Sequence, residues 1–112
     1  MKKIILSILV LCFAIHAWAH DFTIGVLSYD IISETEQTVE VFAEEWMSAA
    51  YNIPETVSYN GKTYTVVSIG RKAFSHRDNL TMVNIPKTVK KIGYEAFAYC
   101  SYLKNINFFT TQ

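Results

Sequence analysis

The stretch that decides the fold occurs twice: residues 69–85 read IGRKAFSHRDNLTMVNI, and residues 92–108 read IGYEAFAYCSYLKNINF. The two copies share one glycine and a set of apolar residues at equal spacing, while the positions between them vary. A period in the twenties is typical of a leucine-rich-repeat solenoid, in which each coil buries its apolar face against the next. The recurring positions are therefore predicted to form the core: Ile69, Ala73, Phe74, Leu80, Val83, Ile85, Ile92, Ala96, Phe97, Leu103, Ile106 and Phe108.

Each repeat is predicted to combine short strands with a short helical segment. Residues 80–85 alternate in polarity and predict a strand that ends at Pro86, because proline has no amide hydrogen to donate. Residues 89–92 predict a second short strand, and residues 94–100 fit about two helical turns. The predicted fold is a β-rich leucine-rich-repeat solenoid of short strands and short helical turns, with a repeat of about 23 residues and an N-terminal β-hairpin cap.

The outward positions of the two repeat strands form a candidate partner-binding stripe. Alternation places Met82 and Asn84 outward on one strand, and Asn105 and Asn107 outward on the next. Stacked strands would align these side chains on the sheet face that solenoids use for binding. The alternative interpretation is that the asparagines only solvate an exposed strand.

A partial repeat precedes the two clean copies. Residues 53–57 (IPETV) resemble residues 85–89 (IPKTV), and Asn60-Gly61 follows them. Asn-Gly between alternating residues is the strongest short signal for a two-residue type I′ hairpin. Pairing Tyr59 with Lys62 would place the apolar side chains of this hairpin on one face.

The segment before the partial repeat is predicted to be a small β cap. Residues 22–32 and 38–42 alternate in polarity and predict two strands joined as a hairpin. Residues 44–51 (EEWMSAAY) are predicted to form a loop that carries Trp46 inward, because a segment of this length is marginal for a helix.

The motif I-G-x-x-A-F, the leucine six positions after its phenylalanine, and the phrase I-P-x-T-V resemble the leucine-rich repeats of the BspA-like (bacterial surface antigen) family. The resemblance covers residues 53–108, and residues 57–66 look like the lead-in common in such proteins. It implies an exported solenoid, often associated with the cell surface and with adhesion to host or bacterial partners. The second copy departs from the pattern, with Phe109 at the proline position and Gln112 at the valine position, so the chain resembles a short or truncated member.

Residues 1–19 have the features of a secretory signal peptide. A basic pair, an apolar run and an A-x-A site predict cleavage after Ala19, and the apolar run is shorter than the roughly 20 residues that a spanning helix needs. The rival interpretation is a lipoprotein signal at Cys12, which the bulk of the preceding Leu11 disfavours. The predicted organisation is a signal peptide at 1–19, an acidic N-terminal β cap at 20–52, and repeats at 53–112 that comprise a partial repeat with hairpin at 53–68, a repeat at 69–91 and an incomplete repeat at 92–112.

The formal net charge is zero, but the charges are unevenly distributed. Residues 20–57 contain eight acids and no Lys or Arg, whereas residues 58–112 contain eight bases and two acids. A basic half can indicate nucleic-acid binding, but here the bases are scattered singly in a chain predicted to be exported. A solvated repeat surface is the favoured interpretation, and no nucleic-acid partner is predicted.

No residue pattern indicates catalysis, a cofactor or a metal site. His20 would become an amino-terminal histidine able to bind copper, but only His76 would remain to complete such a site. Cys100 is predicted to be a buried structural cysteine, because no neighbouring base in the sequence would lower its pKa. In an oxidising compartment, this cysteine could also form a disulfide with another chain. The chain is not predicted to be an enzyme.

The predicted function is that of an exported leucine-rich-repeat binding module, secreted or at the cell surface, that mediates adhesion or protein–protein interaction. Host matrix or another cell surface would supply the partner. The alternative is a structural or assembly unit, or a truncated repeat fragment without independent function. The coil that ends at Phe108 and Phe109 is expected to present an open apolar face, through which residues 102–111 would support self-association.

Overall fold

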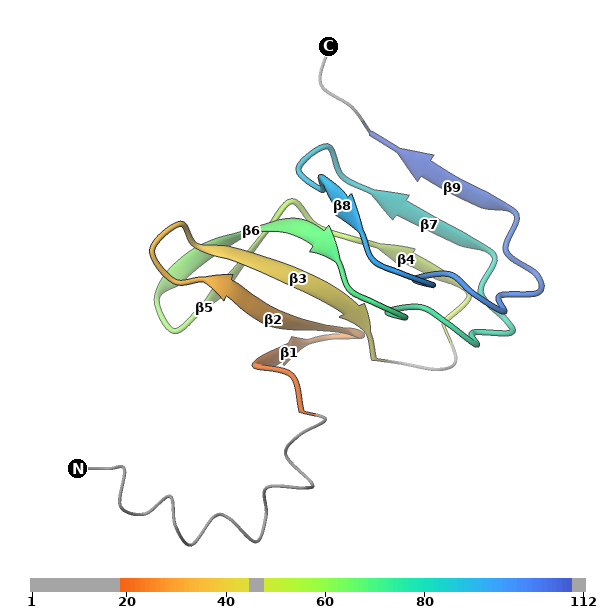
Figure 1. The fold of residues 1–112 in the computed structure, drawn as a ribbon, viewed down its shortest axis with the longest axis horizontal. Helices are drawn as coiled ribbons and strands as arrows, with labels where there is room; N and C mark the ends of the chain where they lie inside the picture. The colour runs from red at the N-terminus through yellow and green to blue at the C-terminus, as the bar shows by residue number, and fades with distance from the viewer. Residues whose placement is uncertain (1–18, 45–47, 110–112) are drawn as a thin grey trace, which may run out of the picture.

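The protein is represented by a computed structural model that describes residues 19–44 and 48–109. The predicted signal peptide, apart from Ala19, and the predicted inward position of Trp46 lie outside the described residues. Within those residues no helical segment has the length and apolar character needed to span a bilayer. They form the following strands (Figure 1): β1 (Phe22–Ile24), β2 (Leu27–Ser33), β3 (Thr38–Ala43), β4 (Ala50–Asn52), β5 (Thr56–Tyr59), β6 (Lys62–Ile69), β7 (Met82–Ile85), β8 (Lys91–Ile92) and β9 (Asn105–Phe108).

The strands belong to two sheets. Each coil contributes one strand to the larger sheet and then one strand to the smaller sheet. The larger sheet has the order β1-β2-β3-β6-β5, with β8 beside β6, and the smaller sheet has the order β4-β7-β9. The strand pairs β3–β6, β6–β8, β4–β7 and β7–β9 are all parallel. The described residues therefore form stacked coils that run from β3 to β4, from β6 to β7 and from β8 to β9. The first of these coils lies inside the segment predicted to be a cap.

The predicted helical turns at residues 94–100 are wrong, because these residues form non-helical turns. Glu95 and Tyr99 have left-handed φ values of 54° and 59°, which a right-handed helix does not contain. The same conformation occurs at the equivalent positions of the preceding repeat, Lys72 (φ 56°) and His76 (φ 59°). The turn conformation therefore repeats with the sequence.

Hydrogen bonds between coils explain why these turns are not helical. Amides of one coil donate to carbonyls of the next at 2.8–2.9 Å, in the pairs Lys72 to Tyr94, Phe74 to Ala96 and His76 to Ala98. In a helix, the same amides would bond within their own segment and would not join the two coils at this turn. Helix propensity is a weak preference of less than about 1 kcal/mol per residue, and the tertiary hydrogen bonds override it here.

The hairpin predicted at Asn60-Gly61 is confirmed. Both residues have positive φ, 51° and 77°, as a type I′ turn requires. Tyr59 pairs with Lys62, as the register predicted. The predicted antiparallel pairing of residues 22–32 with 38–42 is also confirmed in β2 and β3.

Two short strands differ from the sequence prediction. The residues predicted as one strand at 22–32 form both β1 and β2, because Gly25, with φ 65°, reverses the chain between Ile24 and Leu27. The predicted loop at 44–51 ends in strand β4 instead. Tyr51 is 1% exposed, so the driving force for this strand is burial against the next coil rather than local propensity.

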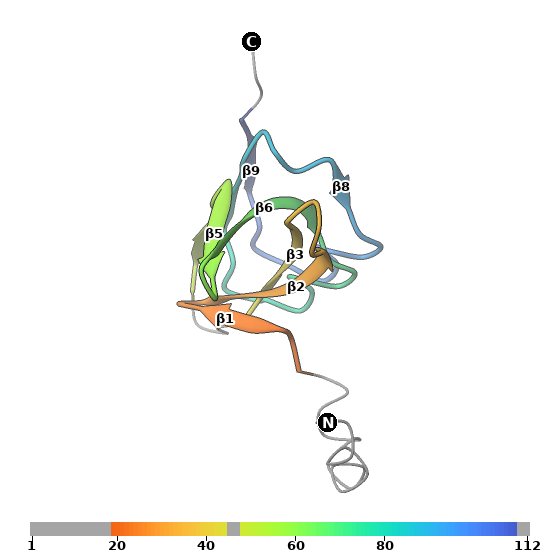
Figure 2. The same ribbon diagram turned by 90° about the vertical axis from the view of Figure 1, so that its left-hand side faces the viewer.

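The larger sheet curls so that its two edge strands approach each other. Phe22 of β1 stacks on Tyr59 of β5 with ring centroids 4.2 Å apart, and the two strands lie close together in Figure 2. The stacked rings therefore bridge the two edges of this sheet.

Most of the predicted core residues are buried, but those of the last coil are not. Ile69, Ala73, Phe74, Leu80, Val83, Ile85 and Ala96 are buried, and Phe97 and Leu103 are half-buried against them. Ile92, Ile106 and Phe108, which the repeat pattern assigned to the core, are 42%, 37% and 58% exposed, and an open apolar face was also expected for this last coil. A coil buries the face of the preceding coil, and no described residue covers the last one.

The recurring glycines allow the coils to approach each other. A Cβ atom added at Gly70 would lie 2.1 Å from the ring of Phe42, and one added at Gly93 would lie 2.6 Å from the backbone nitrogen of Arg71. Both distances are far shorter than van der Waals contact. A larger residue at Gly93 would push two backbones apart, and one at Gly70 would force the Phe42 ring to move.

Phe74 tests the core assignment, because its fully buried ring contacts Tyr51 at 5.1 Å and Phe97 at 5.3 Å between centroids. Phe74→Ala is expected to lower the free energy of unfolding by about 3–5 kcal/mol. The matched control, Phe108→Ala, removes a largely exposed ring and is expected to cost less than about 1 kcal/mol. Urea denaturation of both variants decides this, and similar losses would contradict the coil register.

Gly61 tests the hairpin, because its φ of 77° is strained for any residue with a branched Cβ. Gly61→Val is expected to lower the free energy of unfolding by about 1–3 kcal/mol. Gly61→Asn is the control and is expected to cost less, since asparagine tolerates this conformation. Equal thermal stability of the Val variant and the parent protein would exclude the type I′ turn.

Candidate binding surface

The outward face of the smaller sheet places the predicted stripe on adjacent strands. The register pairs Met82 with Asn105 and Asn84 with Asn107, so the four predicted side chains do lie together. Strands β4, β7 and β9 run side by side in Figure 1, and neighbouring strands in a sheet are about 4.8 Å apart. Whether this stripe binds a partner stays a prediction.

The asparagines of the stripe form a hydrogen-bonded ladder that the sequence analysis did not include in full. Asn52 of β4 lies beside Asn84, whose Nδ2 donates to the Oδ1 of Asn52. The Nδ2 of Asn107 then donates to the Oδ1 of Asn84 at 2.8 Å. One amide from each coil therefore holds its neighbour in a fixed orientation.

Sequence reasoning missed Asn52 because its spacing differs from the repeat. The sequence interval from Asn52 to Asn84 is longer than the interval from Asn84 to Asn107. A signal was nevertheless present: Asn-Ile-Pro at 52–54 recurs at 84–86. The β5–β6 hairpin is inserted between these two phrases, which accounts for the longer interval.

The ladder leaves hydrogen-bonding capacity on the exposed face. A side-chain amide has two donor hydrogens and two acceptor lone pairs. Asn84 uses one of each within the ladder, so one donor and one acceptor remain. The outward residues of these strands carry no charge: Ala50, Asn52, Met82, Asn84, Asn105 and Asn107. This surface is suited to neutral polar groups, such as the peptide groups of another protein.

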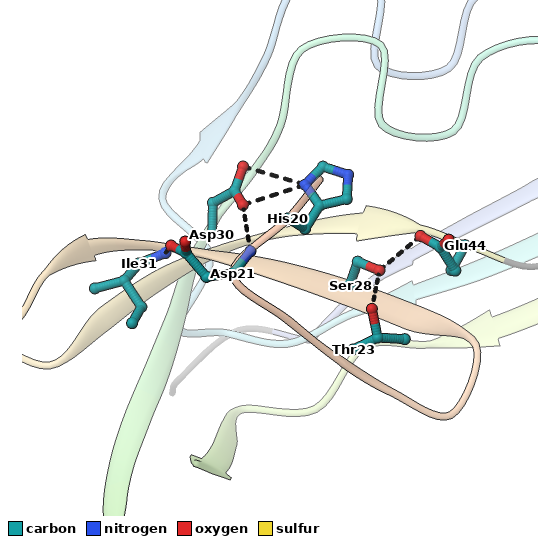
Figure 3. A network of polar contacts seen from close by, with 7 residues as sticks. All are labelled: His20, Asp21, Thr23, Ser28, Asp30, Ile31 and Glu44. Carbon is teal, nitrogen blue, oxygen red and sulfur yellow. Dashed lines mark hydrogen bonds and ion pairs between the residues drawn. The ribbon is translucent and has the colours of Figure 1, made fainter. Parts of the chain in front are cut away.

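The opposite sheet holds the first described residues in place. The Nδ1 atom of His20 lies 3.2 Å from both carboxylate oxygens of Asp30 (Figure 3). The ring of His20 also stacks on Phe42, with centroids 4.2 Å apart. The amide of Asp21 donates to Asp30 at 3.0 Å, and the amide of Ile31 donates to the carboxylate of Asp21 at 2.7 Å. The residue that follows the predicted cleavage site is thus part of the folded domain.

A second polar cluster joins β1, β2 and the end of β3. The hydroxyl of Ser28, which is fully buried, donates to a carboxylate oxygen of Glu44 at 2.6 Å. Thr23 and Ser28 lie 2.7 Å apart through their hydroxyl oxygens (Figure 3). The buried hydroxyl is therefore satisfied, which makes this cluster structural.

The histidines and the cysteine considered from the sequence all have structural contacts. The His20 ring is held by Asp30, and His76 stacks on Tyr99 with centroids 4.6 Å apart. The half-buried Cys100 thiol donates to the carbonyl of Phe74 at 3.0 Å. Across the described part of the chain, no three His, Cys, Asp or Glu side chains group in a way that could hold a metal ion.

Comparison with known proteins identifies the repeats. No curated protein matches this sequence. Residues 67–111 match the sequence family described as "BspA type Leucine rich repeat region (6 copies)". The chain is a leucine-rich-repeat protein of the BspA type. Leucine-rich-repeat proteins generally mediate protein–protein interactions.

Solved structures of bacterial leucine-rich-repeat proteins have a similar fold. One from Bacteroides ovatus is 41% identical, with a TM-score of 0.72, and the match covers 79% of this chain and 23% of that one. A leucine rich cell surface protein from Faecalibacterium prausnitzii is 28% identical, with a TM-score of 0.70 and coverage of 78% and 23%. One from Bacteroides capillosus is 32% identical, with a TM-score of 0.69 and coverage of 78% and 64%. The BspA-type chain thus spans less than two thirds of the length of each relative.

The asparagine ladder can be tested through its central member. Asn84→Ala removes both ladder hydrogen bonds and is expected to lower the free energy of unfolding by about 1–2 kcal/mol. Asn105→Ala is the matched control on the next strand, and a change within about 0.5 kcal/mol is expected there. Thermal or urea denaturation of the two variants of this BspA-type chain measures the difference. Equal stabilities would mean that the ladder contributes nothing to the stacking of coils.

Proposed function

We propose that this protein is an exported binding module that acts at the cell surface through protein–protein interaction. The proposed binding surface is the outward face of β4, β7 and β9, which carries Asn52, Met82, Asn84, Asn105 and Asn107. The observation that carries the proposal is the asparagine ladder, which holds a row of neutral amides in one orientation on an accessible sheet face. Pre-organised groups bind with a smaller loss of conformational entropy than mobile ones.

The chemistry of this face favours a protein partner. Its free amide donors and acceptors complement peptide groups, and Met82 supplies an adaptable apolar contact between them. The outward positions offer no cation to neutralise phosphates and no carboxylate to hold a metal ion. A matrix protein of a host, or a protein on another cell, is the proposed partner.

Three observations support export. Residues 1–19 have the pattern of a signal peptide, and His20, the residue directly after it, contacts Asp30. The similar protein from Faecalibacterium prausnitzii is described as a cell surface protein. Surface biotinylation of intact cells, followed by amino-terminal sequencing, is expected to label a chain that begins at His20. A chain that retains Met1 and is protected from the reagent would contradict export.

The binding proposal is tested with immobilised fibronectin, laminin and collagen as probes. The double variant Asn84→Lys, Asn107→Lys is expected to reduce binding of the parent's preferred probe at least about tenfold, because two desolvated charges oppose the neutral contact. Thr63→Lys on the outer side of β6 is the control, since it adds charge to an exposed position of the other sheet. Equal loss in both variants would indicate a non-specific charge effect and contradict this surface.

A structural or assembly unit is the second candidate, and the last described coil favours it. Ile92, Ile106, Phe108 and Phe109 are each 37–58% exposed, so this coil has an apolar face that another coil could cover. Sedimentation velocity over a concentration series separates the candidates. Assembly through this face predicts that Phe108→Lys abolishes self-association, whereas a binding module remains monomeric in both forms.

A further inference from the structure

A groove lies in the seam between β1 and β5, away from the two clean repeats at 69–108. It has a volume of about 590 Å³ and is lined by uncharged residues from two segments, 24–29 and 52–58. The rings of Phe22 and Tyr59 stack across the seam. We call this feature the seam groove, and its lining residues used below are Ile24, Val26, Tyr29, Asn52, Thr56 and Ser58.

The walls of the seam groove expose apolar side chains. Ile24 is 46% exposed and Val26 is 38% exposed, and they lie on either side of Gly25 at the β1–β2 turn. Pro54 lines the groove from the other segment. Apolar surface of this kind gains free energy when a partner removes it from water.

The groove also contains a polar group without a protein partner. Tyr29 is 1% exposed and lines the groove, and its hydroxyl has no hydrogen-bond partner among residues 19–44 and 48–109. Burial raises the pKa of this phenol to about 12, so it remains a protonated donor throughout the physiological range. The hydroxyl atom itself still reaches solvent through the groove, so a ligand carrying an acceptor could take the place of water there.

An unpaired strand edge borders the same groove. β5 is the last strand of the larger sheet and, among the described strands, pairs only with β6. In an antiparallel pair with a two-residue turn, Tyr59 and Val57 bond toward β6, so the backbone groups of Thr56 and Ser58 point away from it. Thr56 and Ser58 both line the groove. Their amide and carbonyl groups are free to pair with an added strand.

We propose that the seam groove binds an extended apolar peptide segment of a partner protein, which adds as a strand beside β5. Its carbonyl groups would accept from Thr56, Ser58 and the Tyr29 hydroxyl, and alternate side chains would cover Ile24 and Val26. This site goes beyond the β4–β7–β9 surface and does not depend on it, although Asn52 borders both.

The acidic residues around the groove determine which residues are favoured at the two ends of the peptide. All described lining residues are uncharged, and residues 20–57, which supply most of them, contain eight acids and no Lys or Arg. Glu55 stands between the lining residues Pro54 and Thr56 and is exposed. The favoured peptide therefore has an apolar, alternating centre and a basic residue at its ends.

The experiment uses labelled nonapeptide probes in fluorescence anisotropy. The first probe is Lys-Thr-Val-Thr-Val-Thr-Val-Thr-Lys, the second has glutamate at both ends, and the third has proline for the central valine. The lysine-flanked probe is expected to bind with a Kd below about 1 mM, and the glutamate-flanked probe about tenfold more weakly. The proline probe is expected not to bind, because it cannot complete the strand hydrogen bonds.

Tyr29→Phe is the decisive variant, because it removes only the hydroxyl. It is expected to weaken binding of the lysine-flanked probe about fivefold. Tyr64→Phe is the matched control, since that hydroxyl donates to Glu34 at 2.8 Å away from the groove, and unchanged affinity is expected. Ile24→Lys changes an exposed position and is expected to abolish binding without unfolding the domain.

Amide chemical-shift mapping locates the bound probe. The proposal predicts shifts confined to residues 24–29 and 52–59. It is overturned if no lysine-flanked probe binds, if Tyr29→Phe binds as tightly as the parent, or if the shifts map to β7 and β9. Shifts of the same groove residues by maltohexaose, with none from the peptides, would assign the groove to a carbohydrate and overturn it as well. Loss of matrix binding in the Asn84 and Asn107 variant would leave these outcomes unaffected.

Discussion

The rest of the structure depends on the backbone hydrogen bonds that join successive coils in one register. They pair Val41 with Ile69 and Ile69 with Ile92 in one sheet, and Tyr51 with Val83 in the other. The turns between the sheets continue the same ladder through their amides. Because side chains alternate along a strand, a shift of one position would move the core residues to the surface. The sequence repeats with a fixed period because this register places equivalent residues of successive coils beside each other.

The candidate surface and the core both follow from the alternation of inward and outward side chains along β4 and β7. The register that buries Val83 beside Tyr51 also brings Asn84 beside Asn52, where the two amides bond. The ladder therefore needs no separate scaffold, since its orientation is inherited from the packing beneath it. The seam groove has a different origin. It lies where the two edges of the larger sheet, bridged by the stacked Phe22 and Tyr59 rings, face each other.

The sequence alone determined the features whose causes are local or periodic. Asn60-Gly61 specifies its turn because both residues tolerate positive φ, and the pairing of the flanking strands follows from that turn. The repeat of apolar residues in 69–108 specifies stacked coils, because only stacking buries one face of each. Alternation around Val83 was sufficient to place Asn84 outward. These properties require no knowledge of distant residues.

The tertiary structure decided what depends on contacts between distant segments. Residues 94–100 have a helical composition, yet their carbonyls accept from the preceding coil, so they form turns. Asn52 joins the ladder only because the hairpin inserted after it returns the chain to register. Ile106 is exposed although its pattern matches the buried Val83, because burial requires a neighbouring coil. Tyr29 becomes a buried donor in a groove only when β1 and β5 meet, and no periodicity in the sequence records how two sheet edges approach.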